Sequence, residues 1–224
     1  MLGQKPMIQW VYEAASRVFS HLVVATDDRR IGDVVESFGG VAVMTSPEHQ
    51  TGTERCAEAF RLYRRETGID FTHVVNIQGD EPLIKKEQLN LLKACLLEEG
   101  TEIATLIHPT RDTKEVENPN TVKVVIDPDY KALYFSRSPI PHIRNPVHNW
   151  IENHCYFIHL GIYGFRAAIL EKLVRLDPTP LEAAESLEQL RWLEHGFTIR
   201  TRETSDRVKG VDTPEDLEAL NALL

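Results

Sequence analysis

Short apolar runs alternate with amphipathic stretches along the first half of this chain, and this alternation most restricts how it can fold. Residues 22–25, 41–44 and 73–77 are compact apolar runs typical of buried strands. Residues 28–38 and 52–66 carry apolar side chains at helical spacing. Strands that alternate with helices predict an α/β fold with a mostly parallel sheet flanked by helices.

The second half of the chain departs from this pattern. Residues 122–127 and 132–136 predict an antiparallel pair. Residues 137–158 are rich in Pro, His and Asn, and we interpret them as an irregular excursion over the surface or into a partner subunit. Residues 181–194 predict one long helix, and Thr213 is expected to cap the last helix. Without a visible linker, residues 1–224 are expected to form a single domain.

Composition excludes several classes of partner. Lys and Arg number 25 and Asp and Glu number 34, so the net charge is −9, which disfavours duplex nucleic acid and anionic membranes as main partners. No apolar run approaches the roughly 18 residues of a membrane span. Three widely spaced cysteines (Cys56, Cys95 and Cys155) are typical of a reducing compartment. We therefore expect a cytoplasmic enzyme.

Familiar catalytic motifs are missing from the sequence. It contains no GxGxxG after a strand, no GxxxxGK[ST], no GxSxG and no HExxH. The sequence therefore lacks the motifs that would indicate a dehydrogenase, a Walker-type nucleotidase, an α/β-hydrolase or a zincin.

Carboxylates follow a predicted strand at one place and precede a helix at another. Gln78 and Asp80 come directly after the apolar run at 73–77, where open α/β sheets bind their ligands. A carboxylate there suits Mg²⁺, although a turn whose Asp80 caps the next helix explains the pattern equally well. Asp212 precedes the Thr-Pro start of the last helix, where ordinary capping is the simpler explanation.

Two further pairs of polar side chains lie in the second half. Strand alternation places His159, Gly161 and Tyr163 on one face, which could receive the hydroxyl groups of a sugar. A half-exposed strand is the alternative. Glu188 and Gln189 belong to a predicted helix with an apolar stripe, where solvated charges are the default.

Taken together, these stretches resemble the 3-deoxy-manno-octulosonate (Kdo) cytidylyltransferase family, also called CMP-Kdo synthetase. The segments that carry the match occur in order over nearly the whole chain: residues 3–8, 24–27, 44–45, 49–55, 76–82, 118–120, 122–125, 133–137, 159–163, 187–191 and 210–217. As a set, these segments are far more specific than any one of them.

The resemblance implies a nucleotide-diphospho-sugar-transferase-like, Rossmann-like fold with a mixed sheet. It implies an enzyme that couples CTP to Kdo, giving CMP-Kdo and pyrophosphate, and so supplies Kdo for lipopolysaccharide. It implies a homodimer with residues 137–158 at the interface. It also implies site residues: Asp80 and Asp212 as catalytic Mg²⁺ ligands; Gln78, His159, Tyr163, Glu188 and Gln189 for the sugar acid; and Thr51, Gly52 and Arg55 for the nucleotide.

The sequence departs from the family at its start. Family members begin with an apolar strand and a basic loop ending in Pro-Gly-Lys that grips the CTP phosphates, whereas this sequence begins just after that point. We expect either that Met1 is an internal methionine assigned as the start of the protein or that the sequence is truncated. Without the loop, we expect the chain as given to bind CTP weakly and to have negligible activity. Two alternatives stay open: the same chemistry on 8-amino-Kdo or a sialic acid, and an inactive dimeric binding protein.

Overall fold

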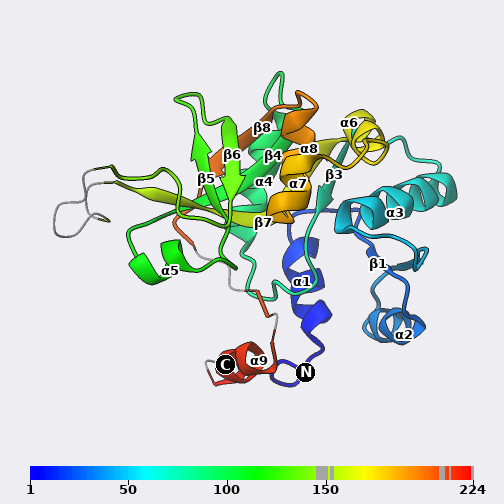
Figure 1. Cartoon of the computed structure of the whole chain (residues 1–224). Helices are drawn as coiled ribbons and strands as arrows, with labels where there is room; N and C mark the ends of the chain where they lie inside the picture. The colour runs from blue at the N-terminus through cyan, green and yellow to red at the C-terminus, as the bar shows by residue number, and fades with distance from the viewer. Residues whose placement is uncertain (145–150, 152–153, 207–209, 212, 223–224) are drawn as a thin grey trace. The chain divides into compact units, whose positions relative to one another are not determined.

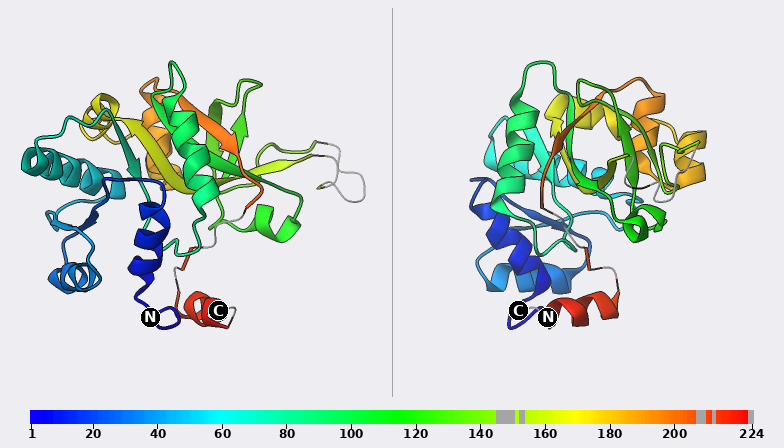
Figure 2. Two further views of the ribbon diagram at one scale, coloured as in Figure 1. Left: turned by 180° about the vertical axis from the view of Figure 1, so that it is seen from behind. Right: turned by 90° about the vertical axis from the view of Figure 1, so that its left-hand side faces the viewer.

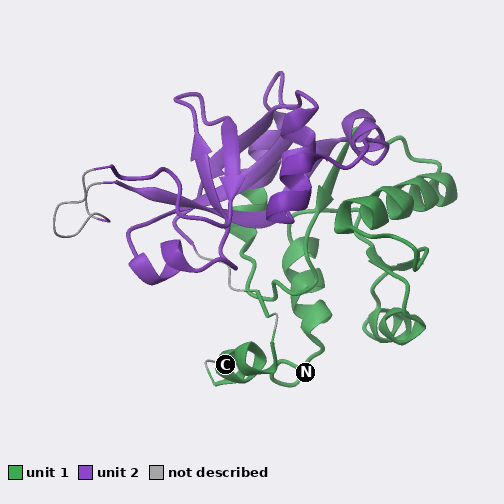
Figure 3. Cartoon of the chain, viewed as in Figure 1, with its two compact units in different colours: residues 1–90, 208–224 green, residues 91–207 purple. Residues whose placement is uncertain are grey.

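The computed structural model describes residues 1–144, 151, 154–206, 210–211 and 213–222 (Figure 1). The chain forms two compact units: unit 1 comprises residues 1–90 and 208–224, and unit 2 comprises residues 91–207 (Figure 3). The single domain expected over residues 1–224 stays a prediction. The strands of the second half pair with one another.

Unit 1 combines a small parallel sheet with helices. Its elements are α1 (Met7–Ser16), β1 (Val24–Thr26), α2 (Arg29–Ser37), β2 (Ala42–Met44), α3 (Gly52–Thr67), β3 (His73–Asn76) and α9 (Pro214–Asn221). Strands β1 and β2 pair in parallel, with Val24 opposite Ala42. Helix α2 packs against both strands.

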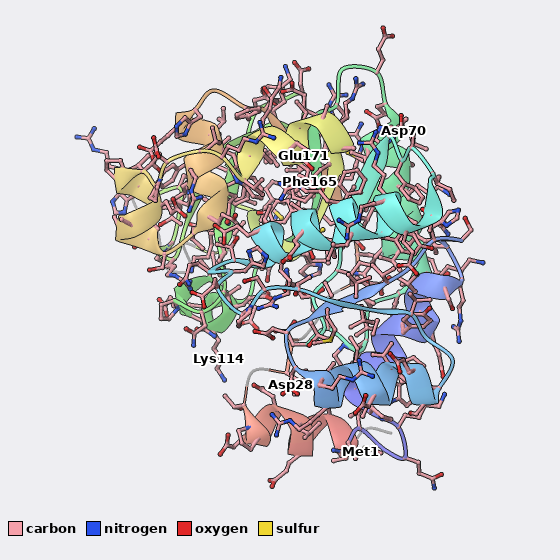
Figure 4. The ribbon with its side chains drawn as sticks, turned by 90° about the vertical axis from the view of Figure 1, so that its right-hand side faces the viewer. Met1, Asp28, Asp70, Lys114, Phe165 and Glu171 are labelled. Atoms are coloured by element: carbon pink, nitrogen blue, oxygen red, sulfur yellow. The ribbon has the colours of Figure 1, made fainter. Side chains whose placement is uncertain are left out.

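Local capping explains where α2 begins and ends. The Asp28 carboxylate accepts a hydrogen bond of 2.8 Å from the backbone N–H of Arg30, at the start of the helix (Figure 4). After the helix, Gly39 takes a left-handed φ of 80°, which glycine adopts without steric penalty. The predicted helix at 28–38 is therefore confirmed.

The two ends of the chain meet within unit 1. Asn221 at the end of α9 accepts a hydrogen bond of 2.7 Å from the Gly3 N–H and donates one of 3.4 Å to the Met1 carbonyl. Helix α9 and the N-terminal residues accordingly lie close together in every view (Figures 1 and 2). Helix α9 starts as predicted, since the Thr213 hydroxyl accepts from the Asp216 N–H at 3.1 Å.

Unit 2 is built on a mixed sheet in which β6, β5, β7, β4 and β8 are neighbours in that order. Helix α4 (Lys86–Leu97) leads into this unit, whose further elements are β4 (Ile103–Thr110), α5 (Thr113–Glu117), β5 (Lys123–Ile126), β6 (Ala132–Ser136), β7 (Tyr156–Arg166), α6 (Ala167–Leu173), α7 (Pro180–Glu185), α8 (Glu188–Glu194) and β8 (Ile199–Glu203). Strand β4 pairs in parallel with β8 and antiparallel with β7. Ile103, Leu106 and Phe165 are fully buried, so the sheet carries the core of the unit.

The α/β class, the mixed sheet and the flanking helices are confirmed, but the predicted excess of parallel pairs is not found in unit 2. The pairs β5–β6, β5–β7 and β4–β7 are antiparallel. A short turn joins β5 to β6, and a connection that short allows only antiparallel pairing. The antiparallel pair predicted around that turn is confirmed.

The prediction of one helix over residues 181–194 is wrong. Ser186 takes a left-handed conformation with φ 52° and separates α7 from α8. Arg137 supplies the physical reason, because its guanidinium donates to the carbonyls of Glu185 at 2.7 Å and Ser186 at 3.3 Å. Those hydrogen bonds satisfy backbone acceptors that a helix end leaves open.

The irregular stretch predicted at 137–158 ends earlier than expected, since β7 already begins at Tyr156. Residues 145–150 and 152–153 of this stretch lie outside the described residues. In the part of the chain that the structure describes, no helix has the length and apolar character needed to cross a bilayer.

Candidate functional site

The predicted site residues fall into two groups. We call the group in unit 1 the strand-end group: Thr51, Gly52, Arg55, Gln78 and Asp80. We call the group in unit 2 the β7 group: His159, Tyr163, Glu188 and Gln189. Asp212, the second predicted metal ligand, lies outside the described residues.

In the strand-end group, the start of α3 lies against the end of β3. Thr51 caps α3, and its hydroxyl accepts a hydrogen bond of 3.2 Å from the Glu54 N–H. A Cβ added to Gly52, the first helical residue, would lie 3.4 Å from Nε2 of Gln78 and 3.7 Å from Nδ2 of Asn76. Two segments far apart in sequence are therefore adjacent here, and Gly52 presents bare backbone to the Gln78 amide.

Arg55 connects the ends of β1 and β2. Its Nη1 donates to the Thr45 hydroxyl at 2.8 Å, and its Nη2 pairs with the Asp27 carboxylate at 3.1 Å. The side chain is 23% exposed. The guanidinium therefore bonds residues at the ends of both strands. A contact between Arg55 and a nucleotide stays a prediction.

A backbone hydrogen bond joins the two aspartate motifs. Asp80 follows β3, and its carbonyl accepts a hydrogen bond of 2.9 Å from the N–H of Val211, the residue before Asp212. Among the described residues, no three His, Cys, Asp or Glu side chains are grouped so that they could hold a metal by themselves. A Mg²⁺ site at Asp80 and Asp212 stays a prediction.

The β7 group depends on a bulge in its strand. Thr105 of β4 lies opposite Tyr163, but the next residue, Leu106, lies opposite Leu160, so β7 accommodates extra residues between them. This bulge lies between His159 and Tyr163, whose rings are 5.1 Å apart between centroids.

His159 sits in an aromatic and largely apolar setting. The Phe135 ring meets the imidazole edge to face at 5.1 Å, and Nε2 lies 3.0 Å from the Thr105 hydroxyl. Burial lowers the pKa of His159 to about 3, so the imidazole is neutral at neutral pH.

Tyr163 is buried beside it, and no hydrogen-bond partner for its hydroxyl is found in the described part of the chain. Burial and the nearby charge of Glu188 raise the pKa of Tyr163, so its hydroxyl keeps its proton. An unpartnered buried hydroxyl is uncommon in folded proteins, and it can hydrogen-bond a ligand.

Helix α8 brings the carboxylate of Glu188 near these rings. Trp192 packs edge to face on Tyr163 at 4.9 Å. Glu188 lies one turn earlier on the same helix, and residues four apart share a face. Gln189, next in sequence, is 6% exposed. The structure therefore brings His159, Tyr163 and Glu188 together, and their binding of a sugar acid stays a prediction.

Thr105 and the bulge in β7 were not predicted from the sequence. Simple alternation does not govern residues 159–163, because the bulge breaks it. Gly161 was the available signal, since a glycine inside a strand pattern often marks a bulge. No local signal pointed to Thr105, which lies on a different strand.

Comparison with known proteins settles the family. Residues 1–203 match the sequence profile of a family described as Cytidylyltransferase. The 3-deoxy-manno-octulosonate cytidylyltransferase of Parabacteroides distasonis is 46% identical, over 100% of this chain and 89% of that protein. This chain belongs to the 3-deoxy-manno-octulosonate cytidylyltransferase family. A relative with the same name from Porphyromonas gingivalis is 49% identical, over 100% of this chain and 88% of that protein.

Solved structures agree with this family. The structure of CMP:2-keto-3-deoxy-manno-octonic acid synthetase complexed with CTP has a TM-score of 0.88 and 41% identity, covering 98% of this chain and 87% of that one. The 4-diphosphocytidyl-2C-methyl-D-erythritol synthase of Anaerococcus prevotii has a TM-score of 0.60 at 15% identity, which shows the fold alone. The predicted resemblance to Kdo cytidylyltransferases and the predicted Rossmann-like nucleotidyltransferase fold are both confirmed.

Proposed function

We propose that this protein transfers the cytidylyl group of CTP to the anomeric hydroxyl of Kdo. The hydroxyl oxygen forms a bond to the α-phosphorus, the bond to the β-phosphate breaks, and CMP-Kdo and pyrophosphate leave. The observation that carries the proposal is 46% identity to a 3-deoxy-manno-octulosonate cytidylyltransferase along the whole chain.

We assign the nucleotide and the metal to the strand-end group. Gly52 offers close backbone approach, and Arg55 and Thr51 offer donors at the start of α3, where anions are favoured. Asp80 and Asp212 are the Mg²⁺ ligands in this proposal, supported by the hydrogen bond between Val211 and Asp80. Bound Mg²⁺ would neutralise triphosphate charge and lower the pKa of the attacking hydroxyl.

We assign the sugar acid to the β7 group. A neutral imidazole, an unpartnered tyrosine hydroxyl and the amide of Gln189 are suited to the hydroxyl groups of a sugar. Glu188 adds an acceptor for sugar hydroxyls. The binding of the sugar acid by Gln78, whose amide has both donors and an acceptor, stays a prediction from the family resemblance.

We further propose that the protein acts in the cytoplasm as a homodimer, with residues 137–158 at the interface. The three widely spaced cysteines support the cytoplasmic location. The Pro- and His-rich sequence of residues 137–158 supports their place at the interface. Sedimentation at micromolar concentration measures the oligomeric state directly.

Replacing Asp80 tests the assignment of the metal. Asp80→Asn keeps the size of the side chain and removes its charge, so we expect kcat to fall by at least about 100-fold, which corresponds to roughly 3 kcal/mol of lost transition-state stabilisation. Asp212→Asn is expected to have a similar effect. The measurement is pyrophosphate release with CTP, Kdo and Mg²⁺.

Asp70→Asn is the matched control, because Asp70 is 80% exposed and pairs with Arg64 on the surface (Figure 4). Its activity should match that of the parent protein. The assay also includes a second chain that carries, at its N-terminus, the basic loop ending in Pro-Gly-Lys that is typical of the family. Release from neither chain would overturn the proposed function, and normal release from Asp80→Asn would overturn the metal assignment alone.

A further inference from the structure

We propose that Thr105 is a positioning residue that selects the tautomer of His159, so that Nδ1 of the imidazole accepts a hydrogen bond from a hydroxyl of the sugar substrate. The choice of ligand rests on the proposed function. The tautomer itself does not, because it follows from groups of the protein alone.

The hydrogen bonds of Thr105 decide which way its proton points. This side chain is fully buried, and its hydroxyl oxygen lies 2.7 Å from the Ile162 carbonyl and 3.2 Å from the Leu160 carbonyl. A carbonyl can only accept, and a hydroxyl has one proton to donate. The proton therefore points at the bulge of β7, with Ile162 as the nearer acceptor.

With its proton committed, the Thr105 oxygen presents only lone pairs to His159. The Nε2 atom lies 3.0 Å from that oxygen, so Nε2 must carry the hydrogen that completes the bond. A neutral imidazole has one N–H, and burial keeps this imidazole neutral by lowering its pKa. Nδ1 is consequently an acceptor.

The second polar group of the pair is the Tyr163 hydroxyl. It retains its proton and has no partner among the described residues, and its ring lies 5.1 Å from the imidazole. The two side chains together therefore offer one acceptor and one donor. A hydroxyl can both donate to Nδ1 and accept from Tyr163, whereas an ammonium can only donate and a carboxylate can only accept.

This complementarity makes Thr105 a specificity-determining residue for a neutral hydroxyl. In the other tautomer, with the hydrogen on Nδ1, the imidazole and Tyr163 would both donate. A substrate hydroxyl that needs an acceptor for its own proton would then lose one hydrogen bond, worth about 1.4 kcal/mol or tenfold in affinity.

Nitrogen NMR of protein labelled with ¹⁵N-histidine reads the tautomer directly, without substrate. We expect the His159 signals to show a protonated Nε2 and an unprotonated Nδ1, with the assignment made by comparison with His159→Gln. Thr105→Ser retains the hydroxyl and should keep this pattern. Thr105→Val loses the hydroxyl and should shift the pattern toward protonated Nδ1 or a mixture.

Kinetics provide the second readout. Thr105→Val should raise KM for Kdo about tenfold while KM for CTP stays unchanged, and Thr105→Ser should restore the parent value. Thr201→Val is the matched control, because Thr201 lies opposite Thr105 on β8 and is equally buried, while its hydroxyl donates to the Tyr130 carbonyl at 2.9 Å.

The outcomes separate this inference from the proposed function. A parent protein with hydrogen on Nδ1, or a folded Thr105→Val with the parent pattern, overturns the inference. If Thr105→Val does not fold, the parent and Thr105→Ser spectra still decide the tautomer. A protein that shows the expected tautomer but releases no pyrophosphate with Kdo leaves the role of Thr105 standing and overturns the proposed substrate.

Discussion

At the scale of a single residue, His159 links stability to pH. Its pKa falls from 6.5 to about 3 on folding, so between these values the unfolded chain binds a proton that the folded chain does not. The free energy of unfolding should therefore decrease as pH falls through this window. We expect His159→Gln to remove about 1 to 2 kcal/mol of the difference in stability between pH 7 and pH 5, measured by urea denaturation.

The expected size is below the full linkage value, because part of the His159 side chain remains exposed. His195→Gln is the control, since His195 follows α8 in the same unit and is exposed. It should leave the pH dependence of the parent protein in place. An identical pH dependence in His159→Gln and the parent protein would contradict the neutral state of the buried imidazole.

At the scale of elements, one buried charge joins the ends of β5 and β6. Nζ of Lys123 donates to the carbonyls of Asn118 at 2.9 Å and Thr121 at 2.6 Å, and to the carbonyl of Arg137. Burial lowers the pKa of Lys123, yet three acceptors require all three N–H donors of the ammonium, so the side chain is charged. Lys123→Met would remove a charged donor from all three carbonyls, although the Asn118 carbonyl keeps its hydrogen bond of 3.1 Å from the Thr121 N–H, and we expect it to lose at least about 2 kcal/mol of unfolding free energy.

Urea denaturation followed by tyrosine and tryptophan fluorescence measures this loss. Lys93→Met is the matched control, because Lys93 is exposed on α4, and its effect should stay within about 0.5 kcal/mol. Equal stability of the two variants would show that the ammonium contributes nothing to holding β5, β6 and the Arg137 backbone together.

For the whole molecule, the main feature is that unit 1 is discontinuous in sequence. It combines residues 1–90 with residues 208–224, and its C-terminal helix α9 contacts the N-terminal residues. Leu220 of α9 is 4% exposed, and Asn221 binds the backbone at Met1 and Gly3. We expect Leu220→Ala to destabilise this contact by about 2 kcal/mol. Hydrogen exchange should then speed up in α1 and α9, while β4 of unit 2 keeps its protection.

Glu218→Ala is the control on the same helix, since Glu218 is exposed and its backbone remains helical. It should leave exchange unchanged in both units. Faster exchange throughout both units in Leu220→Ala would show that the two units unfold together, and unchanged exchange in α1 would show that α9 does not support the N-terminus.

Features that depend on neighbouring residues in the chain can be predicted from the sequence. Helices α2, α3 and α9 begin where Asp28, Thr51 and Thr213 cap them, because each cap bonds a backbone N–H two or three residues away. The β5–β6 pair was predictable for the same reason, since a short turn sets its direction. The ordered motifs likewise identified the family correctly.

Only the tertiary structure decided which distant segments meet. The bulge between His159 and Tyr163 depends on pairing with β4, and the break at Ser186 depends on Arg137. The bond between Val211 and Asp80 joins residues from opposite parts of the chain. Such contacts depend on strand register and on buried hydrogen bonds that form only once the chain has folded, and no nearby residue specifies them.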